Sequence, residues 1–438
     1  MYQGIPVKPT LSVADTYREG EAILRKLFVI SLAVIGFSTA TVTTPAFAAY
    51  SDVPTTSWAY TAVQYVSVTN NWVPPHTDGF RPDVSLNRIE FARALVRAFA
   101  PAEPVDPSIT FTDIPATGSD DSYRVANVAV KEGWLAPVAG AFQSLGTVTK
   151  ASMDRALVMA LGLNSVAAGL NAISTSDGYR FAHSSWFAYY ILSNELHLNF
   201  NYPSALEKQE VLASSPVSRA FMSYGLWQAK TLSEWELSAI QSYSHIVLPP
   251  MNAIEKQVVN FAFRYAGYPY VYAGEWYKPT GSGYCCGTQL QGGFDCSGFA
   301  WWVLKAPAGT WDNGSWNNVG LRGYTGWSLP QRGAAAMTEY APIRYYFSKL
   351  QPMDLLGFNT DDQGTGWSGV DHAGLFLGNG WMIHSSGSRG GVSIDYIWSG
   401  SWWYSRFVWG RRLLPTYTPP PPPPPPSPSP SPTPSSTP

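Results

Sequence analysis

The chain has 438 residues, of which 45% are apolar and only 13% are charged, and its formal net charge is −2 at pH 7. This length exceeds that of an ordinary single domain and predicts two or three folded units. The near-neutral charge argues against nucleic-acid binding, which needs an excess of clustered Lys and Arg. The 18 Trp and 25 Tyr residues have two interpretations: aromatic-rich cores, or flat apolar platforms for sugar rings.

The first 48 residues have the pattern of an export signal. Arg25 and Lys26 precede an apolar run over 27–35, and a polar stretch then ends in Ala-Phe-Ala at 46–48, a small-residue cleavage pattern. The apolar run is shorter than the ~20 residues that a membrane-spanning helix needs. We therefore expect cleavage after Ala48 and a mature protein that is secreted to the cell wall or cell surface, with no membrane span.

Residues 50–232 contain three weakly similar units, at about 50–105, 110–165 and 170–232. Each unit is predicted to be helix, loop, helix, because apolar residues recur at helical spacing and Gly or Pro marks the turn. A basic residue stands where the second helix of each unit is expected to begin: Arg88, Lys150 and Arg219.

These units resemble S-layer homology repeats. The resemblance implies an all-α, pseudo-threefold module that binds the pyruvylated secondary polymer of a bacterial cell wall. The residues that match the binding motif of that family are Arg88, Glu90, Lys150 and Arg219. A cation beside the free N–H groups of a helix N-terminus can hold a carboxylate, which is consistent with such a ligand. The alternative is that these are exposed charged residues without a specific ligand.

The repeat pattern is lost over 233–252, where we expect a linker before a second folded unit at 253–414. Residues 415–438 are almost purely Pro, Ser and Thr. Such a composition cannot bury a core, so this segment is expected to be a disordered, extended tail.

The second unit contains a cysteine in a setting typical of a nucleophile. Cys296 lies in the sequence Phe-Asp-Cys-Ser-Gly-Phe, at the expected start of an apolar helix. Three cysteines in an exported protein leave at least one unpaired, and a free thiol there suggests a chemical role. The positive end of the helix dipole is expected to lower the pKa of Cys296 and favour the thiolate. A buried structural thiol is the alternative.

Two histidines follow on either side of a hairpin signal. Asp-His-Ala-Gly ends in Gly374 and precedes Gly-Asn-Gly, and the next apolar run contains His384. A three-residue loop that ends in a left-handed Gly380 places His384 opposite Gly374, with His372 a diagonal neighbour on the same face at roughly 7–8 Å. A two-residue turn would place the two histidines on opposite faces. We predict the three-residue loop, with Leu377 paired to Trp381.

This register predicts His372 as the base for Cys296 and His384 as the residue that orients its ring. Paired histidines with a cysteine can also bind zinc, but neither Cys-x-x-Cys nor His-x-x-x-His spacing is present. We therefore expect no metal and no cofactor.

In this order, the three motifs resemble those of the NlpC-type, papain-like cell-wall peptidases over about 253–412. The resemblance implies a small α+β domain whose nucleophilic helix packs on an antiparallel sheet. It implies hydrolysis of a peptidoglycan stem-peptide bond of the D-γ-glutamyl-diamino acid type. It also implies that Tyr270, with a backbone N–H near Cys296, stabilises the oxyanion; a packing role for Tyr270 is the alternative. An amidase, a transpeptidase-like acyltransferase and a non-catalytic wall-binding protein remain open.

Two segments depart from that family pattern. The segment 275–293 is longer than expected and contains Cys285 and Cys286, which are predicted to form a vicinal disulfide or to bond another chain, and the segment itself is a candidate lid. A Trp-rich stretch at 310–331 is expected to widen or cover the groove. Both segments bear on substrate preference.

Overall fold

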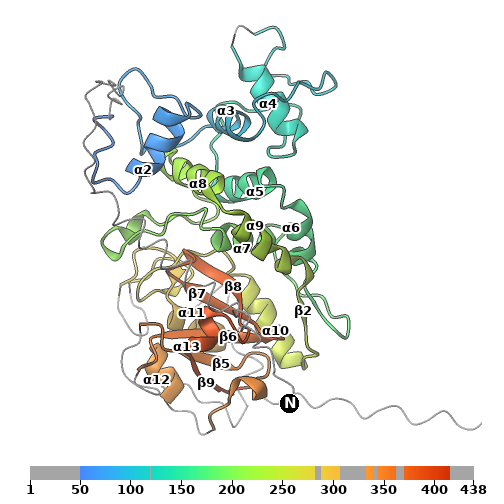
Figure 1. Cartoon of the computed structure of the whole chain (residues 1–438), viewed down its shortest axis with the longest axis vertical. Helices are drawn as coiled ribbons and strands as arrows, with labels where there is room; N and C mark the ends of the chain where they lie inside the picture. Colours follow the sequence, from blue (N-terminus) through green and yellow to red (C-terminus); the bar gives the residue numbers. More distant parts are fainter. Residues whose placement is uncertain are drawn as a thin grey trace, which may run out of the picture.

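The computed structural model describes residues 50–118, 120–281, 288–305, 332–339, 343–361 and 369–414. The helices of the N-terminal part and the sheet of the C-terminal part form two adjoining halves of the molecule (Figure 1). The predicted export signal, the tail, the Cys285–Cys286 pair and the 310–331 stretch lie outside the described residues. Within them, no helix combines the length and apolarity needed to cross a bilayer.

The described chain as far as residue 231 is mainly helical. Its helices are α2 (Tyr60–Val63), the π-helix η1 (Gln64–Thr69), α3 (Arg88–Phe99), α4 (Ser122–Lys131), α5 (Lys150–Ala160), α6 (Asn164–Asn171), α7 (Phe187–Glu195), the 3-10 helix η2 (Ser204–Gln209) and α8 (Arg219–Thr231). The expected second helices of the three units correspond to α3, α5 and α8. Each begins after a residue whose side chain accepts a hydrogen bond from a backbone N–H of the first turn, which fixes its start: Asn87, Thr149 and Ser218.

The three units meet at a ring of backbone hydrogen bonds. The N–H of Leu86 donates to the carbonyl of Val217 at 2.9 Å, the N–H of Val217 to Val148 at 3.0 Å, and the N–H of Val148 back to Leu86 at 3.1 Å. All three residues lie one position before the capping residue of α3, α5 or α8. Similar segments therefore occupy similar positions around a common axis, as three related units would.

The expected linker at 233–252 is instead a folded connection. It contains α9 (Glu234–Ala239), the 3-10 helix η3 (Ile240–His245) and β2 (Val247–Leu248), which pairs in parallel with β1 (Ser174–Thr175). Ser233 and Glu236 form a capping box that starts α9. The side chains that hold the connection in place are buried: Ile240, Tyr243, Ile246 and Leu248.

The described C-terminal part is built on a five-stranded antiparallel sheet with the strand order β8-β7-β6-β5-β9, which confirms the expected antiparallel sheet. Its strands are β5 (Leu355–Phe358), β6 (His372–Gly378), β7 (Trp381–Ser386), β8 (Gly391–Tyr396) and β9 (Phe407–Arg411). The helices are α10 (Ala253–Phe263), α11 (Cys296–Lys305), α12 (Ala334–Glu339), the 3-10 helix η5 (Phe347–Lys349) and α13 (Trp402–Arg406), and β3 (Glu275–Trp276) pairs with β4 (Gly293–Phe294).

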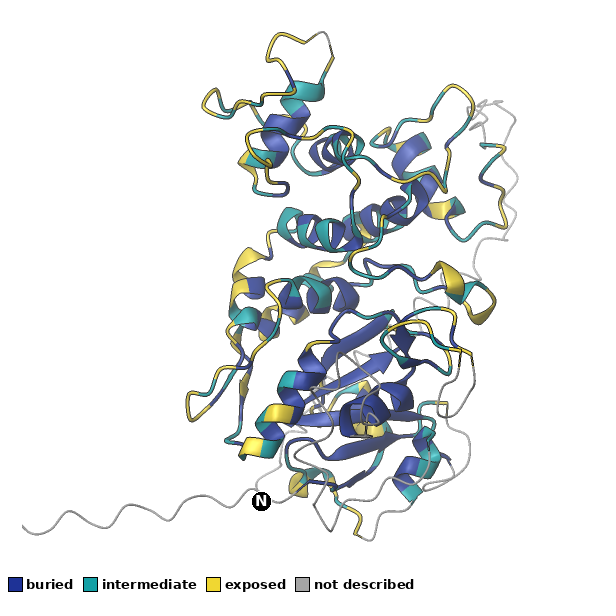
Figure 2. Ribbon diagram, turned by 180° about the vertical axis from the view of Figure 1, so that it is seen from behind, coloured by how far each residue is buried: buried dark blue, intermediate teal, exposed yellow. Residues whose placement is uncertain are grey.

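The two faces of the sheet pack into different apolar clusters. Leu355, Leu375 and Ile383 belong to a large core that includes α10 and α11 and extends through the helical part of the chain. Their strand neighbours belong to a second, smaller core with Trp403 of α13: Leu356, Phe376 and Met382. Because side chains alternate along a strand, these sets lie on opposite faces. Figure 2 shows the strands as buried, so both faces of the sheet are covered.

The helical part also covers the edge strand β8. The side-chain amide of Asn194 in α7 donates to the carbonyl of Val392 at 3.1 Å, and the Tyr243 hydroxyl donates to the carbonyl of Ile394 at 2.7 Å. An edge strand presents backbone groups that no neighbouring strand pairs. Here the helical part donates to two of its carbonyls, and that of Val392 also accepts from the backbone N–H of Gly267. The helical part and the sheet are therefore joined by specific contacts as well as by a continuous core.

The β6–β7 hairpin has the predicted register but a different turn. Leu375 pairs with Ile383 and Phe376 with Met382, whereas Gly378 pairs with Trp381 after a bulge. Asn379 and Gly380 have φ of 50° and 85°, as a two-residue type I′ turn requires. The predicted three-residue loop was therefore wrong. The bulge inserts one residue into β6 and restores the register that the two-residue turn alone would shift.

Replacing Gly380 by Ala should destabilise this hairpin. A Cβ there would lie 2.8 Å from the carbonyl oxygen of Ile397, and the residue has a positive φ. The change Gly162→Ala is a matched control, because Gly162 has φ +75° and no atom within 4 Å of such a Cβ. The control should cost about 1–2 kcal/mol for the left-handed backbone alone. Thermal unfolding should give a larger loss for Gly380→Ala, and equal losses would contradict the close packing of this turn.

Candidate active site

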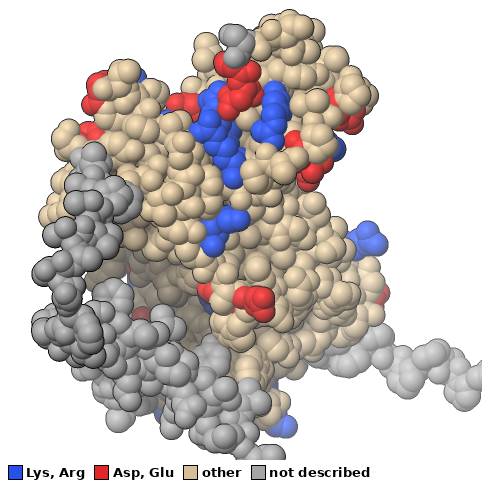
Figure 3. Space-filling model, turned by 45° about the horizontal axis from the view of Figure 1, so that its top comes forward, with Lys and Arg blue, Asp and Glu red and all other residues tan. Residues whose placement is uncertain are grey.

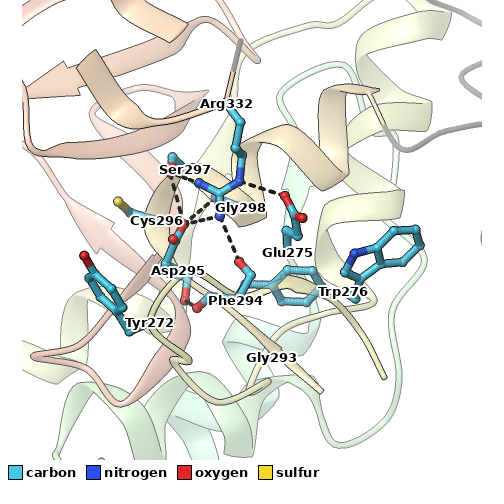
Figure 4. Close-up of polar contacts among 12 residues, drawn as sticks. Tyr272, Glu275, Trp276, Gly293, Phe294, Asp295, Cys296, Ser297, Gly298 and Arg332 are labelled. Atoms are coloured by element: carbon cyan, nitrogen blue, oxygen red, sulfur yellow. Dashed lines mark hydrogen bonds and ion pairs between the residues drawn. The ribbon is translucent and has the colours of Figure 1, made fainter. Parts of the chain in front are cut away.

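Cys296 is the first residue of α11, and the residues around it hold the start of that helix. The Asp295 carboxylate accepts hydrogen bonds from the N–H of Gly298 and the hydroxyl of Ser297, and it pairs with Arg332 at 2.9 Å. In Figure 4 the Cys296 sulfur points away from the Arg332 guanidinium. Asp295 therefore occupies the helix N-terminus and leaves the thiol free to face another element.

Arg332 connects this helix start to the preceding segment. Its guanidinium also pairs with the Glu275 carboxylate at 3.1 Å and donates to the carbonyl of Gly274 and to the hydroxyl of Ser297. A Cβ at position 298 would lie 1.9 Å from that Gly274 carbonyl oxygen, so only Gly fits there. The Asp-Cys-Ser-Gly motif is thus a packing motif that presents the thiol.

The Cys296 thiol faces the start of β6. Its Sγ lies 3.7 Å from the carbonyl oxygen of Asp371, the residue before His372. The Asp371 carboxylate accepts hydrogen bonds from the N–H and hydroxyl of Thr360 and from the N–H of Asp361. This carboxylate ties the loop after β5 to the start of β6 and fixes the backbone that holds the thiol and His372 together.

A hydrogen-bonded row of three side chains crosses three adjacent strands. His372 Nε2 on β6 lies 2.7 Å from His384 Nδ1 on β7, and His384 Nε2 lies 2.9 Å from Asp395 Oδ2 on β8. A Cβ on Gly374 would meet the Cβ of His384 at 3.4 Å, so the two positions face each other as predicted. Met382 pairs with Asp395 in the β7–β8 ladder, which makes Asp395 a diagonal neighbour of His384 on the same face.

Trp403 of α13 covers the histidine pair. The centroid of its ring lies 4.9 Å from that of His372 and 4.9 Å from that of His384, tilted on the first ring and edge-on to the second. Because His384 is fully buried and His372 nearly so, the row is shielded from water. Charge changes within it are therefore only weakly screened.

Burial sets the protonation states of the site. It raises the pKa of the Cys296 thiol to about 12, and the negative charge of Asp295 acts in the same direction. Burial and repulsion by His384 hold the pKa of His372 well below its usual value. The expected helix-dipole effect on the thiol is thus outweighed, first by burial and then by the negative charge of Asp295 at the helix N-terminus. Near neutral pH the Cys296 thiol and the His372 imidazole are therefore both uncharged.

Asp395 stays ionised although it is buried. Burial opposes the charge, but the positive Arg389 and the hydrogen bond from His384 hold the pKa of Asp395 well below its usual value. The sequence interpretation did not include this residue. A signal was present: Val392 and Ile394 alternate with Ser393 and Asp395 after two glycines, which is typical of a strand.

Tyr270 lies between the loop after β7 and the start of α11. Its N–H donates to the carbonyl of Gly390, and it forms a parallel bridge with Phe294, two residues before Cys296. Burial, together with the nearby Cys296, raises the pKa of the Tyr270 phenol. The phenol is therefore protonated and able to donate a hydrogen bond. The adjoining segment forms the β3–β4 ladder, and its tip at 282–287 lies outside the described residues.

Each of the three basic residues among the four predicted wall-polymer residues is already engaged by groups of the protein. Arg219 is buried and pairs with Glu90 at 2.9 Å, and Lys150 is buried and pairs with Asp154 at 2.6 Å. Arg88 donates to two backbone carbonyls and lies 5.0 Å over the ring of Phe142. Figure 3 shows positive and negative side chains interspersed over the helical part of the chain on the face in view. Within the described residues no cluster of His, Cys, Asp and Glu has the arrangement of a metal site.

The geometry is that of a papain-like site: a thiol at a helix start faces the backbone on either side of His372, where a strand of an antiparallel sheet begins. In comparison with known protein families, residues 267–412 match the NlpC/P60 family. This part of the chain is an NlpC/P60 domain.

Among curated proteins, a probable endopeptidase from Mycobacterium tuberculosis is 31% identical over 106 residues, which are 24% of this chain and 20% of that protein. Probable endopeptidase p60 from Listeria grayi is 34% identical over 126 residues, 28% of this chain and 19% of that protein. The chain thus spans about a fifth of the length of these relatives. The structure of the peptidoglycan hydrolase RipB from M. tuberculosis aligns with a TM-score of 0.26 at 21% identity, covering 38% of this chain and 70% of that one. The two endopeptidase relatives support a peptidase.

The protonation states predict how Cys296 reacts with an alkylating reagent. Since the thiol is neutral below its raised pKa and only the thiolate reacts, the rate with iodoacetamide should keep rising through pH 9. Peptide-level mass spectrometry would separate Cys296 from Cys285 and Cys286. A rate plateau between pH 5 and pH 7 would instead show a preformed thiolate–imidazolium pair and contradict this assignment.

Proposed function

We propose that the protein is a secreted, wall-anchored cysteine peptidase that hydrolyses a peptide bond of the peptidoglycan stem, of the D-γ-glutamyl-diamino acid type. The observation that carries this proposal is the buried row from His372 through His384 to Asp395, beside the Cys296 thiol. A thiol needs a base that is held in one orientation and one tautomer, and this row supplies both requirements.

The row fixes the tautomer of each histidine in its neutral form. Because Asp395 is ionised, Nε2 of His384 carries a proton and donates it to the carboxylate. Nδ1 of His384 is then unprotonated and accepts a hydrogen bond from Nε2–H of His372. This leaves Nδ1 of His372 without a proton, as a base for the thiol requires.

The reaction follows from these states. His372 accepts the thiol proton as Sγ of Cys296 attacks the carbonyl carbon of the substrate, and the imidazolium is stabilised through His384 by the Asp395 charge. The Tyr270 phenol and a backbone N–H near Cys296 donate to the oxyanion. His372 then protonates the departing amine, which leaves a thioester on Cys296. Water, deprotonated by His372, releases the acid product and restores the thiol.

The stem peptide is proposed as substrate because the Cys and His motifs resemble those of cell-wall peptidases and because both curated relatives are described as probable endopeptidases. An amidase would use the same residues on a different amide bond. A transferase would pass the acyl group from Cys296 to an amine instead of water. A non-catalytic wall-binding protein would keep the fold without turnover.

Incubation of the full chain with purified muropeptides should yield two shorter products, one ending in a new carboxyl group and one beginning with a new amine. Cys296→Ala should abolish this cleavage, because no other residue supplies the acyl acceptor. The double change Cys285→Ser and Cys286→Ser is the matched control and should keep the activity. Mass spectrometry distinguishes hydrolysis from amine adducts, and cleavage by Cys296→Ala would contradict the mechanism.

We also propose that the helical repeats hold the enzyme on the cell wall by binding its secondary polymer. The ring of hydrogen bonds joining Leu86, Val148 and Val217 supports three related units. Arg88 is the best candidate contact among the basic residues, because Lys150 and Arg219 are buried. The full chain should sediment with cell-wall sacculi and remain in solution when the secondary polymer has been stripped from them. Sedimentation unaffected by the stripping would contradict this mode of anchoring.

A further inference from the structure

Arg389, in the loop between β7 and β8, connects the catalytic row to the helical part of the chain. Its guanidinium donates to Asp395 Oδ1 at 2.8 Å. It also pairs with Glu195 Oε2 at 3.2 Å, donates to the backbone carbonyl of Glu195 at 3.2 Å, and lies 3.3 Å from His197 Nε2. Three of these four contacts come from the C-terminal end of α7 and the residue two positions beyond it.

Glu195 is held in place by burial and by a hydrogen bond to the sheet. It is the last residue of α7, it is buried, and its carboxylate accepts a hydrogen bond from the hydroxyl of Ser393 at 2.6 Å. Ser393 lies on β8 directly opposite His384 in the β7–β8 ladder. Glu195 thus contacts both the strand that holds Asp395 and the cation that neutralises it.

We propose that Glu195 is a positioning residue of the peptidase, and that the helical repeats thereby complete the catalytic row of the NlpC/P60 domain. The contacts run from His372 through His384, Asp395 and Arg389 to Glu195, and Glu195 lies outside the residues that match the family. This inference rests on the proposed function for its effect on turnover, but the arrangement itself is open to a test that needs no substrate.

Glu195 can affect the catalytic row because the Asp395 carboxylate accepts hydrogen bonds from two donors, His384 and Arg389. Asp395 accepts from His384 through Oδ2 and from Arg389 through Oδ1, so the plane of the carboxylate depends on where the guanidinium lies. Glu195 and His197 fix the guanidinium from the opposite side. Without the Glu195 side chain, Arg389 loses its side-chain contact on the side away from Asp395 and is free to move toward Oδ2, where it already lies at 3.4 Å. It would then compete with the hydrogen bond that sets the tautomer of His384.

Several neighbours keep this effect local. Asn194 donates to the carbonyl of Val392 and holds β8 without involving Glu195. Tyr243 donates to the carbonyl of Ile394 and also contacts the Glu195 carboxylate, so its bond to β8 remains when that carboxylate is removed. Removing the Glu195 carboxylate therefore leaves the strand attached to the helical part. The variant is expected to fold and to differ from the wild type in the orientation of Asp395.

The test uses the full chain labelled with ¹⁵N-histidine, in which only six histidines contribute signals. The ring N–H of His384 that donates to Asp395 is buried and should give a slowly exchanging, downfield resonance, assigned by its loss in Asp395→Asn. The variants are Glu195→Ala, Glu195→Gln and the control Asp354→Asn. Asp354 is equally buried and pairs with Arg412 at 2.8 Å, but it lies just before β5, at the opposite end of that strand from Phe358, which pairs with His372.

In Glu195→Ala the His384 resonance should broaden or disappear, and kcat on muropeptides should fall about tenfold with KM unchanged, as for other residues that orient a catalytic ligand. Glu195→Gln keeps an oxygen that can accept hydrogen bonds from Ser393 and Arg389. It should therefore restore part of the His384 resonance and part of kcat. Asp354→Asn should change neither. If Glu195→Ala does not fold, the comparison of Glu195→Gln with the wild type decides the question.

An unchanged His384 resonance in folded Glu195→Ala, or in Glu195→Gln where the alanine variant does not fold, would overturn the proposal, whatever the substrate of the enzyme. A wild-type chain that shows the resonance but does not cleave muropeptides would instead contradict the proposed substrate, and the effect of Glu195 would still be read from the resonance.

Discussion

The site depends on one diagonal across a sheet. His372, His384 and Asp395 lie on three neighbouring strands, each two residues along from the position opposite its neighbour, so that their side chains meet on one face. A slip of one residue in either ladder would place one of them on the other face and break the row. The bulge in β6 is therefore a functional feature, because it reconciles a favourable Asn-Gly turn with the register that the histidines need.

Burial allows the Asp395 charge to act on the residues at the other end of the row. In water a carboxylate three groups away from a thiol would matter little, but here Trp403 and the core exclude solvent. The same burial makes a permanent thiolate unfavourable, so Cys296 and His372 do not form a thiolate–imidazolium pair in the resting state. It directs the proton instead: the ionised Asp395 sets the tautomers of both histidines, and the base at His372 follows from them.

The elements that carry Cys296, His372, His384 and Asp395 could be predicted from the sequence to different degrees. The start of α11 at Cys296, the β6–β7 hairpin and the facing of Gly374 and His384 follow from local patterns of turn residues and apolar alternation. Asp395 was not found because β8 is a separate strand whose pairing with β7 is a tertiary choice. The depressed thiol pKa was wrongly expected for a similar reason: burial of the thiol, which raises its pKa most, is a result of tertiary packing. The Asp295 carboxylate, which acts in the same direction, is paired with Arg332, a residue distant in sequence.

The relation between the two halves was least accessible from the sequence. The loss of the repeat pattern predicted a linker at 233–252, yet that segment is folded and its Tyr243 hydroxyl donates a hydrogen bond to the edge strand β8. Weak repeats indicate separate modules, but they contain no information about which side chains cross between modules. Glu195 and Arg389 meet across 194 residues of sequence, and only the folded chain brings them together.

The central claim is that the Asp395 carboxylate sets the state of the catalytic base. The most direct measurement is the kcat of Asp395→Asn in the full chain on purified muropeptides, with Asp354→Asn as the control for the loss of a buried carboxylate. An amide at position 395 can donate to Nε2 of His384 and reverse both tautomers, which leaves His372 unable to accept the thiol proton. The account predicts a fall in kcat of about a hundredfold or more with little change in KM, and a kcat equal to that of the control would contradict it.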